Sequence, residues 1–134
     1  MFSYWIQCHD YGSEDFGAVS LNGAIEAFES FDWARVLALF DEDDDARNCP
    51  PGMGLHDGFG SGNPETRLLH LCPIDEQSLF FNLHYPRKRK WLGFIPTKSQ
   101  EIHYANPYPR RQVPLLIRQF AEDDLAAIIA GKQS

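Results

Sequence analysis

Hydrophobic and polar residues alternate along several short stretches of this chain, which is the spacing of a β-strand with one buried face. The aromatic-rich segment 2–8 predicts a first strand. Further strands are predicted at residues 53–57, 67–72, 78–85, 91–95 and 101–104. Two stretches read as connections: the segment 10–17, rich in glycine and acids, predicts a loop, and the segment 58–64 predicts a hairpin connection. Pro107 and Pro109 are expected to end the sheet.

Elsewhere the apolar residues recur at helical spacing. Ser20 can cap a helix whose apolar face lies within 21–28, and Asp32 can cap a second helix over 33–40. The tail from residue 113 to 130 returns to helical spacing and predicts a broken C-terminal helix. Together the elements predict a single α+β domain. It has an antiparallel sheet of about five strands, two helices in the N-terminal half and one C-terminal helix.

Length and composition fit one cytoplasmic domain. With 134 residues and 43% apolar residues, the chain can form a single core, and its apolar runs are too short for a membrane span. The start lacks the basic region of a signal peptide. Three cysteines without a CxxC pair favour reduced thiols.

Charge is distributed unevenly along the chain. The first 45 residues hold eleven carboxylates against one basic residue, Arg35, a formal charge of −10. The remaining 89 residues carry +3, which gives the total of −7. The densest acidic run, 41–45, directly follows the second predicted helix, so we expect the fold to hold it at a fixed place. Such a patch can steer a basic partner and bind it.

No catalytic or nucleotide-binding motif is present. The glycines between residues 52 and 62 lack the following helix of a phosphate cradle, and the acidic run lacks the alternation of an EF-hand. The basic stretch 87–90 is short in a protein of pI about 5.1, which disfavours nucleic-acid binding. We therefore expect a protein that is not an enzyme and needs no cofactor.

One alternative reading starts from strand alternation. His70, Cys72 and His84 fall on one face of two neighbouring predicted strands, where they could bind a soft metal ion or serve a small enzyme. Packed or hydrogen-bonded histidines explain the same pattern, since no fourth ligand is fixed by spacing. A structural subunit of a larger assembly, using an apolar surface patch, also stays open.

Three stretches carry a resemblance to a known group of proteins: Cys49-Pro50-Pro51-Gly52-Met53-Gly54, Leu69-His70-Leu71-Cys72-Pro73, and the segment from His84-Tyr85-Pro86 through Leu92-Gly93-Phe94. Over residues 20–125 the order of elements resembles small bacterial immunity proteins encoded beside polymorphic toxins of contact-dependent or type VI secretion systems. The resemblance rests on turns and strands and supplies no active site. It implies a cytoplasmic protein that binds a cognate toxin domain, often a basic nuclease, and blocks it.

An acidic surface mimics the phosphate backbone that such a toxin would hold, so the charge distribution and the resemblance support the same hypothesis. The residues expected to bind the toxin's basic side chains are Asp41, Glu42, Asp43, Asp44 and Asp45, with Glu14 and Asp15. Trp33, Tyr11 and Phe59 are candidate aromatic anchors, although Trp33 fits the core equally well. The expected partner is a protein, neither nucleic acid nor membrane, and the expected state is a monomer or weak homodimer.

Overall fold

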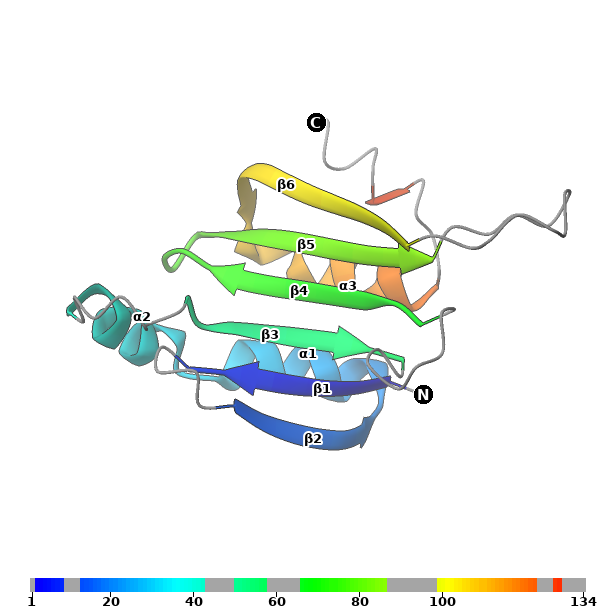
Figure 1. Cartoon of the computed structure of the whole chain (residues 1–134). Helices are drawn as coiled ribbons and strands as arrows, with labels where there is room; N and C mark the ends of the chain where they lie inside the picture. Colours follow the sequence, from blue (N-terminus) through cyan, green and yellow to red (C-terminus); the bar gives the residue numbers. More distant parts are fainter. Residues whose placement is uncertain are drawn as a thin grey trace, which may run out of the picture.

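Six antiparallel strands form one open sheet, with helices on one of its faces (Figure 1). This computed structural model describes residues 2–8, 13–42, 50–57, 66–86, 99–122 and 127–128. The strands are β1 (Phe2–Gln7), β2 (Ser13–Val19), β3 (Gly52–His56), β4 (Leu68–Pro73), β5 (Ser78–Pro86) and β6 (Ser99–Pro109). The helices are α1 (Leu21–Ser30), α2 (Trp33–Glu42), the short 3-10 helix η1 (Arg110–Gln112) and α3 (Val113–Ala121). The predicted α+β class is confirmed.

The strand order is β2-β1-β3-β4-β5-β6. Gln7 pairs with both Ser13 and Gly52, while Pro73 pairs with Leu79 and Ser78 pairs with Pro109. These pairs lie at one end of the sheet. They place the β1–β2 connection, the start of β3 and the β4–β5 turn at that end, which is also where α2 projects from the sheet (Figure 1).

The core lies between the sheet and the helical layer. Alternate residues of β4 and β5 are buried, including Leu69, Leu71 and Leu83, because strand side chains point in turn to the two faces. α1 and α3 pack against each other on this face, and both are drawn behind the sheet in Figure 1. The inner face of β3 contributes Met53 and Leu55. The shared face that the sequence predicts for His70, Cys72 and His84 is confirmed, since the leucines between them are buried on the other face.

Two polar caps start the N-terminal helices as the sequence predicts. The Ser20 hydroxyl accepts a hydrogen bond from the Gly23 amide at 3.0 Å, and the Asp32 carboxylate accepts one from the Arg35 amide at 3.2 Å. Each cap satisfies an amide that the first helical turn leaves free. Trp33 then joins the helices, because its indole Nε1 donates to the Phe28 carbonyl at 2.8 Å.

Two expectations about the sheet are wrong. Much of the predicted loop 10–17 belongs to β2, where Phe16 stacks on Tyr4 with ring centroids 4.6 Å apart. The sheet also continues through Pro107 to Pro109, because β6 lies at an edge, where the missing amide of proline costs no hydrogen bond with a further strand. The strand predicted at 91–95 lies outside the described residues. The predicted C-terminal helix is α3, and residues 127–128 are again helical.

Candidate functional site

The acidic run begins inside α2. Asp41 lies exposed in the last turn of the helix, and Glu42 is its final residue. Asp43, Asp44 and Asp45 follow directly in the sequence and lie outside the described residues. Carboxylates at a helix C-terminus oppose the helix dipole, so this placement does not stabilise α2. The helix therefore presents negative charge at its free end, beyond the sheet.

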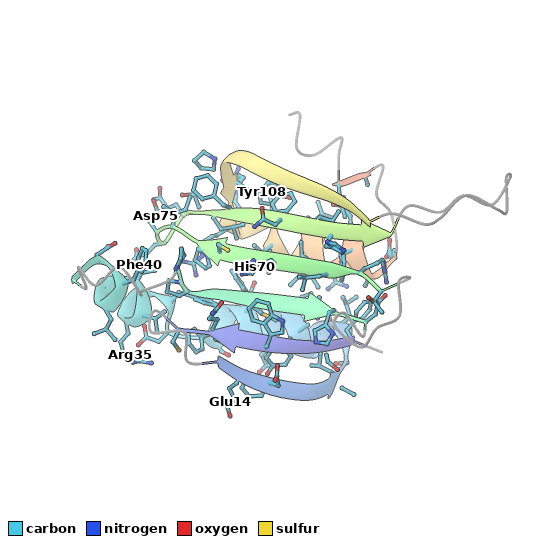
Figure 2. The ribbon with its side chains drawn as sticks, in the orientation of Figure 1. Glu14, Arg35, Phe40, His70, Asp75 and Tyr108 are labelled. Carbon is cyan, nitrogen blue, oxygen red and sulfur yellow. The ribbon has the colours of Figure 1, made fainter. Side chains whose placement is uncertain are left out.

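β2 carries two further predicted acids to the same end of the molecule. Glu14 and Asp15 are exposed and lie within the first three residues of this strand. Ser13 pairs with Gln7 at the sheet end beside α2, and Glu14 and Asp15 are the next two residues of β2. Figure 2 shows Glu14 on this side of the view, as it does Arg35 and Phe40 of α2. The predicted acids that can be placed are thus gathered at one end.

The turn between β4 and β5 adds acids that the sequence analysis missed. Asp75 and Glu76 are exposed in this turn, at the end from which α2 projects (Figure 2). The Asp75 carboxylate accepts hydrogen bonds from the Gln77 amide at 2.7 Å and from the amide and hydroxyl of Ser78 at 2.8 and 3.0 Å. These bonds lower the pKa of Asp75, the Gln77 amide having the largest effect, so its negative charge persists into mild acid. We call Glu14, Asp15, Asp41, Asp75 and Glu76 the acidic end.

Three arginines lie near these acids. The Arg35 side chain is 4.0 Å from the Asp32 carboxylate, and both groups are largely exposed, so this pair contributes little. Arg110 donates to the Asp75 carbonyl at 2.6 Å and lies over the Phe28 ring, 5.7 Å from its centroid. Arg111 is exposed beside it. Arg110 therefore binds the turn and packs on α1, whereas the carboxylates of the acidic end remain exposed.

One predicted anchor is wrong. Trp33 is only 1% exposed, because it packs between Phe28 and Phe31 and its indole N–H is bonded within the chain. It belongs to the core, which is the other role that its position in the sequence allows. Tyr11 and Phe59 lie outside the described residues. Among large apolar side chains that are described, Leu39 on α2, Ile74 in the β4–β5 turn and Phe80 on β5 are exposed and lie near the acidic end.

The structure brings together two of the three residues of the metal hypothesis. His70 Nε2 and Cys72 Sγ lie 3.4 Å apart on the open face of β4. His84 pairs with Leu68, further along the strand. Burial lowers the pKa of His70 and raises that of Cys72 to about 11, so both side chains are neutral near pH 7. Within the described part of the chain, no group of three potential ligands is arranged to hold a metal ion.

Comparison with known proteins adds no relative. No family model, no curated protein sequence and no solved structure matches this chain. Cys72 is a free thiol, and Cys49 lies outside the described residues. Over the same residues, the helices are all too short or too polar to span a membrane.

Proposed function

We propose that this chain is the immunity protein of a polymorphic toxin system, which binds a cognate bacterial toxin domain in the cytoplasm and neutralises it without catalysis or cofactor. The observation that carries this proposal is the acidic end. There, β2, α2 and the β4–β5 turn, far apart in the sequence, expose carboxylates at one end of the molecule. The acidic run continues directly from α2 in the sequence.

An acidic surface of this kind fits a partner whose own active site binds phosphate groups. A basic toxin is attracted over distances of about a Debye length, roughly 8–10 Å in ordinary buffer, before any contact forms. The carboxylates can then pair with the lysines or arginines that would hold its substrate. Such binding would block the toxin without any chemistry by the immunity protein.

Binding is tested with the C-terminal domain of the protein encoded immediately upstream. The two proteins are mixed and separated by size exclusion at about 0.05 M and about 0.15 M salt. The proposal predicts one complex that survives at the higher salt. Two separate peaks at both concentrations would contradict it.

The role of charge is tested by the association rate. Changing Asp41→Asn together with Glu42→Gln should slow association several-fold and flatten its dependence on salt, because steering acts mainly on the on-rate. The matched control is Glu26→Gln with Glu122→Gln, exposed acids on α1 and at the end of α3. It removes the same charge away from the acidic end. Equal rates for the two variants would show that this acidic surface does not steer the toxin.

A second candidate function rests on the contact between His70 and Cys72, which would supply two ligands of a site for a soft metal ion. The protein, purified without a histidine tag, is analysed for metals. Stoichiometric zinc or copper, lost in His70→Ala, would support a metal-binding or enzymatic domain. A metal-free protein would remove this candidate.

A further inference from the structure

The face of the sheet opposite the helices has an unusual composition. The side chains on it belong to alternate residues of each strand, and the described ones include Trp5, His70, Cys72, Phe80 and Asn82. We call this surface the outer face. An antiparallel sheet that faces water on one side normally carries polar and charged residues there. On the outer face, Asp15 is an exposed acid beside Trp5 on the edge strand, and Glu101 is paired with His84 of β5.

Two glycines of β3 shape the centre of this face. A Cβ at Gly54 would overlap the indole ring of Trp5, and a Cβ at Gly52 would lie 2.8 Å from His70 Nε2. Both rings therefore lie across β3, with their centroids 5.1 Å apart. Glycine weakens a strand interior, and it is tolerated where another group approaches the backbone closely. The result is an aromatic platform that spans β1, β3 and β4.

Phe80 extends the platform onto β5. It pairs with Cys72, the neighbour of His70, and it is 40% exposed. A large aromatic side chain beside other aromatic groups is the composition of the centre of a protein interface, where a few such residues supply most of the binding energy. The uncharged forms of His70 and Cys72 keep this centre free of charge near neutral pH.

Carboxylates border the platform on two sides. Asp15 lies next to Trp5 along the edge strand, and the turn that holds Asp75 and Glu76 joins the end of β4 to the start of β5, close to Cys72 and Phe80. An uncharged aromatic centre with an acidic border is complementary to a protein surface with an apolar centre and a border of lysine and arginine.

We propose that the outer face, centred on Trp5, His70 and Phe80, is the surface on which the toxin domain docks, with basic side chains of the toxin against Asp15, Asp75 and Glu76. This inference rests on the proposed function and adds the part of the molecule that is buried in the complex. The acidic end then steers the toxin, and the platform holds it.

The test compares Phe80→Ser with Leu115→Ser. Leu115 is the matched control because it is also a large exposed apolar residue, 51% exposed, but lies on α3. The affinity of each variant for the C-terminal domain encoded immediately upstream is measured by titration calorimetry. We expect Phe80→Ser to weaken binding by about tenfold or more and Leu115→Ser to change it by less than about twofold. Circular dichroism and thermal unfolding confirm that both variants are folded.

Three other outcomes would separate an error in the docking face from an error in the proposed function or show a different occupant. If the domain binds the unaltered chain and both variants equally well, the docking face is wrong while the proposed function stands. If the domain does not bind the unaltered chain, the proposed function fails and the docking face fails with it. If the chain alone forms a dimer that Phe80→Ser dissociates, the platform is covered by a second copy and the inference is overturned.

Discussion

At the scale of single residues, Gly54 and Trp5 form the most closely fitted pair on the outer face. They are direct partners in the pairing of β1 with β3, and the indole lies where a side chain at Gly54 would stand. The backbone at Gly54 does not require glycine, because its φ is outside the left-handed region. The glycine is needed for space alone.

This fit predicts a coupling between the two positions. Gly54→Ala should destabilise the protein by about 1 to 3 kcal/mol in denaturant unfolding, because the indole must leave its place. In the Trp5→Ala background the same change should cost less than about 0.5 kcal/mol, since nothing then opposes the methyl group. Equal costs in the two backgrounds would mean that the indole does not lie over Gly54.

Cys72 predicts how stability changes in alkali. Burial raises the pKa of its thiol from 9.0 to about 11, so between these values the unfolded chain loses the proton while the folded chain keeps it. Stability from this group is fully present below about pH 9 and falls as the pH rises to about 11, by about 2 to 3 kcal/mol. The unfolding free energy of Cys72→Ala should therefore fall less steeply over this range. Parallel curves for the two proteins would contradict the buried thiol.

At the scale of elements, one arginine ties the sheet to the helical layer. Arg67 precedes β4, and its backbone amide and Nε donate to the Asp57 carboxylate at 2.6 and 2.9 Å. Its Nη1 donates to the Phe120 carbonyl near the end of α3 at 2.7 Å. The guanidinium also lies 4.8 Å from the centroid of the Phe120 ring. The residue that follows β3, the start of β4 and the end of α3 are therefore held together by one side chain, which is only 13% exposed.

Arg67→Ala should destabilise the fold by about 2 to 3 kcal/mol, because it removes charge-assisted hydrogen bonds and leaves Asp57 with a partly buried charge. Arg118→Ala is the control, since that arginine is exposed on α3 and should change stability by less than about 0.5 kcal/mol. Chemical denaturation measures both. Similar small losses of stability in the two variants would show that Arg67 does not connect the sheet with the helical layer.

The elements also show what the sequence could predict. β4 and β5 are found from the sequence because a buried face decides which residues are apolar, as with Leu69 and Leu71. β2 is missed because Phe16 and Val19 are its only large apolar residues and its partner, β1, decides its conformation. The order of the strands depends on pairing between distant segments, which local patterns do not encode.

The candidate site, like the fold, can be predicted only in part from the sequence. The sequence alone places Asp41 and Glu42 at the end of a helix, since capping and apolar spacing fix α2. Their grouping with Asp75, and the contact of Trp5 with His70, require the register of strands far apart in the chain. Trp33 was ambiguous because an apolar helical position can face either a core or a partner.

At the scale of the whole molecule, the fold gathers exposed carboxylates from distant parts of the chain at one end of the sheet. The acidic end joins acids from both parts of the sequence, including Asp75 and Glu76 from the part that is basic in total. β5 leaves the sheet at Pro86, at the opposite end, immediately before the basic stretch in the sequence. Under the proposed function, this acidic end orients a basic toxin before contact.

The most direct test of this account measures growth. The C-terminal domain of the protein encoded immediately upstream is expressed from an inducible promoter, alone, with this chain, and with a variant in which the run from Asp41 to Asp45 carries the corresponding amides. The account predicts that the domain alone stops growth, that the unaltered chain restores it, and that the variant restores it less well at equal protein levels. A domain that stops growth equally with and without the unaltered chain would contradict the account, and so would a domain that is harmless alone.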